Sequence, residues 1–150
     1  MAIVNLTPDS FYASSRHASY EAVKQSVERA VMEGATIVDL GGYSSRPGAE
    51  VVSVDEEWRR VEMGLQAVRD ADVEVVVSID TFRSEIVRRA YTCYGAFIVN
   101  DISAGEADAT IIDTVAELGL PYVAMHMRGT PETMRGLTDY KEGVTRGVVD

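Results

Sequence analysis

The sequence has 150 residues, of which 46% are hydrophobic and 25% are charged, as is usual for a soluble globular domain. Its net charge of −10 argues against nucleic acid or an anionic membrane as the partner. We find no apolar run near the roughly 20 residues that span a bilayer, and no signal-peptide pattern. The single cysteine, Cys93, can form no internal disulfide, so we expect a reducing cytoplasm and a small, buried side chain here.

Five runs rich in β-branched residues are predicted to be strands, at 1–6, 35–40, 74–81, 97–100 and 121–126. The run at 74–81 is almost continuously apolar, which is typical of a strand buried on both faces in a parallel sheet. Each run leads into polar residues, which are Asn5, Asp39, Asp80, Asn100 with Asp101, and His126.

Helices are predicted between these strands, because apolar residues recur there at helical spacing. The first is expected to begin at Ser19, and the second at Ser53, which with Glu56 matches a capping box. Three helices are expected to end at the glycines Gly34, Gly95 and Gly119. The predicted buried faces of the second, third and fourth helices comprise Trp58, Val61, Leu65 and Val68; Ile86, Val87, Ala90 and Tyr91; and Ile111, Ile112, Val115 and Leu118. A weaker helical pattern covers 138–150.

Strict alternation of strands and helices predicts an α/β fold with a parallel sheet. Either a doubly wound sheet or part of a (β/α)8 TIM barrel fits this pattern. The glycine fingerprint of dinucleotide folds is absent after the first strand, and polar residues at all five strand exits favour the barrel. A complete barrel needs about 250 residues. We therefore predict that 1–150 is the N-terminal portion of one barrel domain, with about five parallel strands and intervening helices.

The polar residues at the strand exits are candidates for ligand binding. Asp80 could accept two N–H groups from a heterocycle, and Asn100, followed by Asp101, could offer both a donor and an acceptor. An amino-pyrimidinone edge requires this combination. The alternative is that these carboxylates cap helices or pair with arginines.

Two loops could bind ions. The segment 5–10 offers the Asn5 amide oxygen as a metal ligand, although proline and aspartate also form ordinary turns. The segment 44–48 contains two hydroxyls and Arg46, which suit a phosphate group, although it could equally be a flexible loop. His126 and Arg128 favour a structural role over a functional one.

Five segments together resemble dihydropteroate synthase. They occur in that family's order and spacing, and they are NLTPDSF (5–11), GYSSRPGA (42–49), SIDT (78–81), NDIS (100–103) and MHMRGTP (125–131). The resemblance implies a (β/α)8 barrel of folate biosynthesis. Such enzymes condense 6-hydroxymethyl-7,8-dihydropterin diphosphate with 4-aminobenzoate and release pyrophosphate with the help of Mg²⁺.

The resemblance also implies a role for individual residues. Asn5 would ligate Mg²⁺, and Arg46, Asp80 and Asn100 would be the catalytic residues. Asp80, Asn100 and Asp101 would bind the pterin with Ile102 and Met125 packed nearby, Ser45 and Arg46 would contact the pyrophosphate, and Phe11 and Pro47 would help to form the aminobenzoate site, which sulfonamides share.

Departures from the family keep other hypotheses open. Ser45 stands where the family often has Thr, Tyr43 stands where it usually has Glu, and the family's later Asp, Lys and Arg-x-His groups would lie beyond residue 150. We therefore expect little synthase activity from this chain alone. The alternatives are a related pterin enzyme that moves a methyl group from methyltetrahydrofolate to a corrinoid, and a non-catalytic half-barrel that self-associates, as a homodimer or otherwise.

Overall fold

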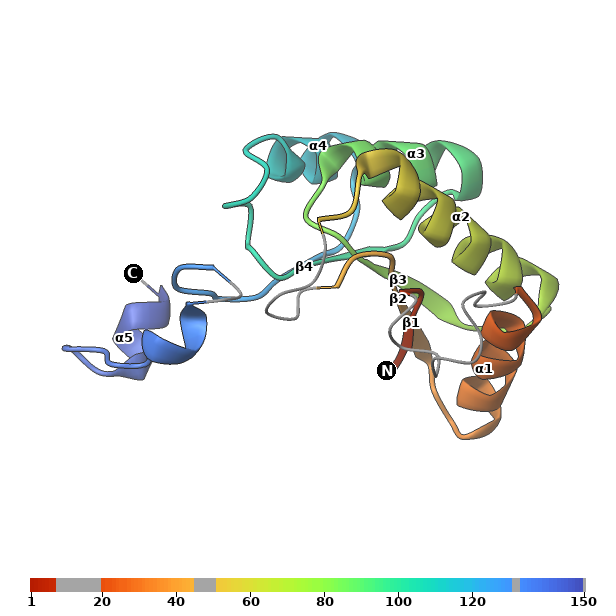
Figure 1. Cartoon of the computed structure of the whole chain (residues 1–150), viewed down its shortest axis with the longest axis horizontal. Helices are drawn as coiled ribbons and strands as arrows, with labels where there is room; N and C mark the ends of the chain where they lie inside the picture. The colour runs from red at the N-terminus through yellow and green to blue at the C-terminus, as the bar shows by residue number, and fades with distance from the viewer. Residues whose placement is uncertain (8–19, 45–50, 131–132, 150) are drawn as a thin grey trace.

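The computed structural model describes residues 1–7, 20–44, 51–130 and 133–149 (Figure 1). These residues form a five-stranded sheet in which every neighbouring pair is parallel and the strands follow the order of the sequence. The strands are β1 (Ala2–Asn5), β2 (Ile37–Gly41), β3 (Val76–Asp80), β4 (Ile98–Asp101) and β5 (Tyr122–Ala124).

Four helices connect these strands and lie side by side on one face of the sheet (Figure 1). They are α1 (Tyr20–Met32), α2 (Val54–Asp70), α3 (Ser84–Tyr94) and α4 (Ile111–Leu118). A doubly wound sheet reverses its strand order and carries helices on both faces. Sequential order with right-handed crossovers keeps all helices on one face instead, as in a barrel. The prediction of a partial (β/α)8 barrel is thus confirmed.

The hydrophobic core lies between the sheet and these helices. Alternate strand residues face the helices, as the two-residue period of a strand requires. The buried strand residues are Val4, Val38, Leu40, Ile79 and Val99, and they pack with Val23, Val27, Val61, Leu65, Ile86, Val87, Ala90, Ile111 and Val115 from the helices. Gly64 allows close packing of α2, because a Cβ atom there would lie 2.8 Å from Cδ1 of Leu6.

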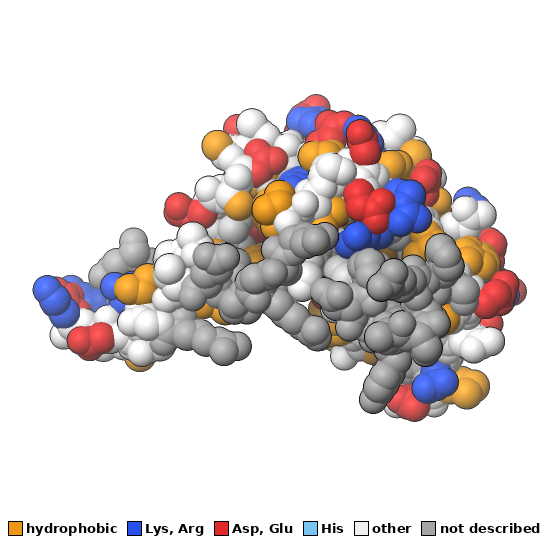
Figure 2. Space-filling model, viewed as in Figure 1, with side chains coloured by type: hydrophobic (Ala, Val, Ile, Leu, Met, Phe, Trp, Pro, Cys, Tyr) orange, Lys and Arg blue, Asp and Glu red, His pale blue; other side chains and the backbone are white. Residues whose placement is uncertain are grey.

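The start of α2 confirms one predicted cap. The Ser53 hydroxyl accepts a hydrogen bond from the Glu56 backbone N–H at 3.2 Å. The Glu56 side chain does not complete the capping box, since it binds Arg59 and Arg60 instead. Figure 2 shows acidic and basic side chains interspersed over the helical layer, as pairs of this kind produce.

The predicted buried positions are confirmed only in part. Trp58 is half-buried and packs against the core, while its neighbour Glu57 is fully buried on the same helix. Tyr91 and Ile112 are exposed, because each follows a buried residue and is turned by about 100° from it around the helix. Cys93 is also exposed, because it lies in the last turn of α3, beyond the buried residue Ala90.

The segment after β5 lies away from the helical layer in Figure 1. It contains a short 3₁₀ helix, η2 (Met134–Gly136), and α5 (Val144–Val149), which has no buried residue and is shorter than the predicted helix. His126 and Tyr140 share a hydrogen bond of 2.9 Å between Nε2 and the hydroxyl. Arg128 donates to the backbone oxygen of Asp139 at 2.7 Å. These contacts favour the structural interpretation of His126 and Arg128.

The sheet face opposite the helices is open and partly apolar. Its most exposed apolar residues in the described part of the chain are Ile3 (77% exposed), Val76 (50%), Val123 (46%) and Met125 (39%). In a complete barrel this face would be the packed interior. None of the helices among the described residues is both long and apolar enough to cross a membrane.

Candidate active site

Three of the predicted site residues lie in one row across the ends of four strands. The register pairs Asn5 with Gly41, Gly41 with Asp80, and Asp80 with Asn100. Paired residues of parallel strands project to the same face, which here is the face opposite the helices. We call these four residues the rim row. Gly41 has no side chain, so it leaves the space between Asn5 and Asp80 open.

Asp80 is the acidic group of the rim row, and its surroundings disfavour the charged form. Burial, followed by the charges of Asp39, Glu57 and Asp101, raises the pKa of Asp80 to about 7. Among the described residues, no lysine or arginine forms an ion pair with Asp80 or Asp39. A half-buried carboxylate without a counter-charge suits a site that receives hydrogen-bond donors or positive charge from a ligand.

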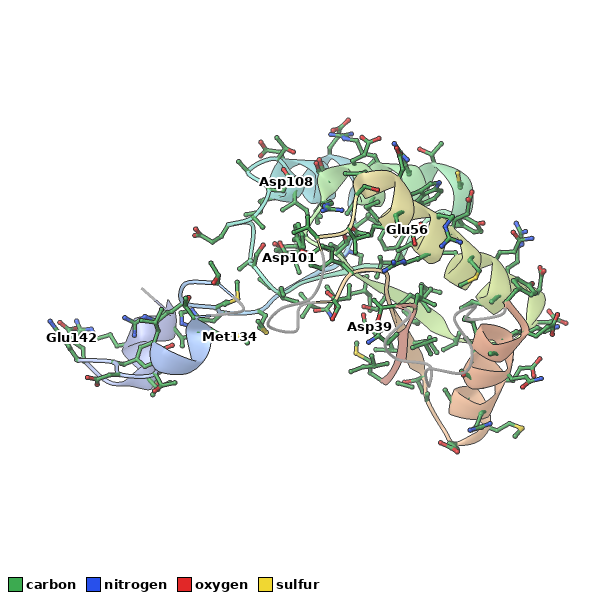
Figure 3. All side chains as sticks on the ribbon, viewed as in Figure 1. Asp39, Glu56, Asp101, Asp108, Met134 and Glu142 are labelled. Carbon is green, nitrogen blue, oxygen red and sulfur yellow. The ribbon has the colours of Figure 1, made fainter. Side chains whose placement is uncertain are left out.

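A second row lies one layer deeper in the sheet. The register aligns Ile3 with Asp39, Asp39 with Ser78, and Ser78 with Ile98. Asp39, labelled in Figure 3, is 3% exposed and accepts two hydrogen bonds. Ser78 Oγ donates to its Oδ1 at 2.5 Å, and Asn100 Nδ2 donates to its Oδ2 at 3.2 Å. Asn100 in the rim row is therefore held from below by a carboxylate two strands away.

Asp101 faces the opposite way, and its described contacts favour a structural role over the predicted contact with substrate. Successive strand residues alternate between faces, so Asp101 points away from the side that Asn100 occupies. Its Oδ1 accepts hydrogen bonds from the backbone N–H and the hydroxyl of Ser103, both at 2.7 Å. Its Oδ2 accepts from the Gly105 N–H at 2.8 Å and the Tyr122 hydroxyl at 2.7 Å. Asp101, also labelled in Figure 3, anchors the loop after β4.

Asn5 contributes an oxygen atom that already accepts hydrogen bonds. The backbone N–H of Thr7 lies 3.2 Å from Asn5 Oδ1, and the Thr7 hydroxyl lies 3.0 Å from the same atom. No group of three or more His, Cys, Asp or Glu residues among the described residues could hold a metal ion. The Asn5 amide oxygen is thus a hard oxygen ligand at this end of the row that is not part of a described carboxylate or histidine cluster.

A buried network ties the loop after β2 to the loop after β3. Glu57 is fully buried and accepts from the Thr81 hydroxyl at 2.6 Å and from Arg83 Nη1 at 2.7 Å. Arg83 Nη2 also donates to the backbone oxygen of Val52 at 2.8 Å. Burial raises the pKa of Glu57, and its bonds to Thr81 and Arg83 act in the opposite direction. Because Thr81 follows Asp80 directly, this network fixes the end of β3.

The other predicted residues divide into two groups. Ile102 is half-buried and Met125 is partly exposed, and each directly follows the end of a strand, Ile102 after β4 and Met125 after β5. Four predicted residues lie outside the described residues, and these are Phe11, Ser45, Arg46 and Pro47.

Sequence reasoning counted Asp39 only as one of the polar residues at the strand exits, without a role of its own, and passed over Glu57, although both carried a signal. Asp39 ends a buried apolar run, as Asp80 does. Glu57 lies four residues before Val61 and eleven before Val68, which places it on the buried stripe of α2. The surrounding apolar stripe, rather than the residue type, was the informative feature.

Comparison with known proteins agrees with this geometry. The family model described as "Pterin binding enzyme" matches residues 1–149. The chain belongs to the pterin-binding enzyme family. The rim row, with Asp80 beside Asn100, therefore lies in a barrel of this family.

Individual members of the pterin-binding family are similar to the chain over most of its length. It is 42% identical over 140 residues to the dihydropteroate synthase of Synechocystis, which covers 93% of the chain and 48% of that protein. A structure of the Xanthomonas albilineans dihydropteroate synthase with 4-aminobenzoic acid is 43% identical, with a TM-score of 0.75 over 86% of the chain and 46% of that protein. A structure of the Clostridium difficile enzyme in the presence of pteroic acid is 28% identical, with a TM-score of 0.85 over 100% of the chain and 54% of that protein. The chain thus spans about half the length of these relatives.

Proposed function

We propose that this chain provides the pterin-binding part of a dihydropteroate synthase. The observation that carries the proposal is the pairing of Asp80 with Asn100 in the rim row. A carboxylate and an amide at adjacent positions match the amino and ring N–H donors of a pterin and its neighbouring acceptor. The relatives crystallised with 4-aminobenzoic acid and pteroic acid support the same assignment.

The proposed reaction replaces one bond to the pterin methylene carbon with another. The bond from that carbon to the diphosphate oxygen breaks, and pyrophosphate leaves with the bonding electrons. The amine of 4-aminobenzoate then forms the new C–N bond and loses a proton. Positive charge develops on the methylene carbon and spreads into the ring. Asp80, which forms no ion pair with a described lysine or arginine, would stabilise that charge electrostatically.

Arg46 and Ser45 are proposed to hold the departing pyrophosphate, and Phe11 and Pro47 the aminobenzoate. For Mg²⁺, the oxygen of Asn5 fits the ion's preference for hard ligands, and water and phosphate oxygens commonly complete such a site. Asn5 would have to release Thr7 to bind the ion. The ion, when bound, would balance charge on the diphosphate.

Calorimetry with 6-hydroxymethyl-7,8-dihydropterin tests the proposed pterin site directly. We expect the 150-residue chain to bind it, and Asp80→Asn to lose binding. Asp113→Asn is the matched control, because Asp113 is an exposed acid on α4, outside the site. Equal binding by the wild-type chain and Asp80→Asn would refute the assignment.

Turnover is a separate measurement. Because the chain spans about half the length of the dihydropteroate synthases compared above, we expect it to bind pterin and to form little or no dihydropteroate alone. Dihydropteroate formation at the rate of a complete synthase would refute this part of the proposal.

The open sheet face favours a second proposal, that copies of this chain associate. Exposed apolar residues gather on this face, and β1 and β5 are edge strands of the described sheet. Light scattering over a range of protein concentrations tests it. We expect the average mass to rise with concentration, and a stable monomer throughout would count against association.

A further inference from the structure

Asp39 is a buried acid for which the proposed chemistry supplies no direct contact. It lies one layer below the rim row, and both of its carboxylate oxygens accept hydrogen bonds. A buried carboxylate without an ion pair is costly, so its presence here calls for a physical explanation. The two side chains that it contacts, Ser78 and Asn100, supply one.

A carboxylate can only accept hydrogen bonds, whereas an amide has a donating and an accepting end. The Nδ2 group of Asn100 lies 3.2 Å from Asp39 Oδ2. If the Asn100 amide turned over, its oxygen would face the carboxylate oxygen, and two acceptors would repel each other. Asp39 thereby determines which end of the Asn100 amide points down and which end is left for the open face.

Ser78 holds the carboxylate itself in place. Its hydroxyl donates to Asp39 Oδ1 at 2.5 Å, and Ser78 is the register partner of Asp39 on the neighbouring strand. Both Asp39 and Ser78 are buried, so water does not compete for these bonds. The three side chains come from β2, β3 and β4, which fixes the amide relative to Asp80 on the middle strand.

We propose that Asp39 is a positioning residue that orients the Asn100 amide so that its oxygen and its second N–H face the pterin. This inference rests on the proposed pterin site. Asp39 itself does not touch the ligand and acts through Asn100. Its role is to give Asn100 one fixed pattern of donor and acceptor, which a freely turning amide would lack.

Two substitutions separate orientation from charge. Asp39→Val removes the acceptor, so the Asn100 amide can adopt either orientation, and we expect dihydropterin binding to weaken roughly tenfold or more. Asp39→Asn keeps an acceptor for Asn100, because the Ser78 hydroxyl can rotate and accept from the new NH₂ group. We therefore expect Asp39→Asn to retain binding within about threefold.

A structural role for Asp39 makes a different prediction. Asp39→Val relieves a buried charge but leaves the Ser78 hydroxyl and the Asn100 N–H without their acceptor, so its effect on stability is the sum of two opposing terms. If Asp39 only supported the fold, affinity would fall no further than the folded fraction measured in a urea titration, whereas we expect the affinity of fully folded Asp39→Val to fall. A loss of binding in Asp39→Asn equal to that in Asp39→Val would show that the charge matters rather than the orientation, and would overturn the inference.

The ligand-free protein provides an independent readout. In ¹⁵N NMR spectra, the side-chain amide of Asn100 can be assigned by its disappearance in Asn100→Asp. We expect one of its protons to be shifted by the bond to Asp39 and to move in Asp39→Val but not in the control Asp113→Asn. An unchanged resonance in Asp39→Val would overturn the inference. Absence of dihydropterin binding by the wild-type chain would instead overturn the proposed function, and the amide resonance would still decide whether Asp39 orients Asn100.

Discussion

Asp80 is expected to make the stability of this protein depend on pH. Burial, with the charges of Asp39, Glu57 and Asp101, raises the pKa of Asp80 from 3.8 to about 7 in the folded chain. Between these values the folded state binds more protons than the unfolded state. The free energy of unfolding therefore falls as the pH rises through this range. Well below the unfolded-state pKa of 3.8, both states are protonated and the effect is absent.

The size of the effect follows from the two pKa values. A shift from 3.8 to about 7 corresponds to about 4 kcal/mol of unfolding free energy, lost in full above pH 7. Asp80→Asn removes the charge while keeping the shape of the side chain. We expect this variant to match the wild-type chain near pH 4 and to exceed its stability by up to about 4 kcal/mol at pH 8. The same variant should lose pterin binding, because the charge that lowers the stability of the fold is also the charge proposed to bind the pterin.

Urea unfolding at several pH values between 4.5 and 8.5 measures this difference. Comparing the variant with the wild-type chain at each pH cancels the titration of groups that both share. Asp113→Asn, which removes an exposed acid, should show no comparable change with pH. A difference between Asp80→Asn and the wild-type chain that stays constant with pH, or a less stable variant at pH 8, would refute the reasoning.

Three further predictions concern residues outside the rim row. Glu57→Ala should lower the free energy of unfolding by about 3 kcal/mol in a urea titration, because it leaves the partly buried Arg83 without its partner; Glu57→Asp, which keeps the charge, should cost less, and equal losses would contradict the ion-pair explanation. Asp101→Ala should lower the free energy of unfolding by about 2–4 kcal/mol, since four donors lose their acceptor. Hydrogen exchange of the backbone amides in the loop after β4 should accelerate in this variant, and unchanged exchange there would be inconsistent with an anchoring role. Cys93 should react with a thiol reagent in the native protein as fast as after unfolding, and a protected thiol would contradict its exposed position.

The fold could be predicted from the sequence because its signals are local. Apolar runs marked the strands, and the glycine at the end of α4 adopts the left-handed conformation, with φ of 63°, that a helix end favours. Helical periodicity was less reliable for the burial of single residues. It could not distinguish Ile111 from Ile112, since both fit an apolar stripe and only packing decides which one faces the sheet.

The candidate site could be predicted only in part. Asp80 and Asn100 follow from the rule that strand ends carry polar groups, and the sheet register brings them together. Asp101 satisfied the same rule but points to the other face, where local hydrogen bonds occupy it. The link from Asn100 to Asp39 joins residues 61 positions apart, and only the register of three strands reveals it.

The two edges of the sheet also limit how copies of this chain could assemble. Its order runs from β1 to β5, so an edge-to-edge contact that continues the parallel sheet joins β5 of one copy to β1 of the next. Such a contact is head-to-tail and ends only if the strands close into a ring. Two copies contribute ten strands, whereas the family's barrel has eight, so two copies have too many strands to close into a barrel of that size. We expect a distribution of sizes rather than one defined dimer, and a polypeptide with three complementary strands would cap both edges at once and end the growth.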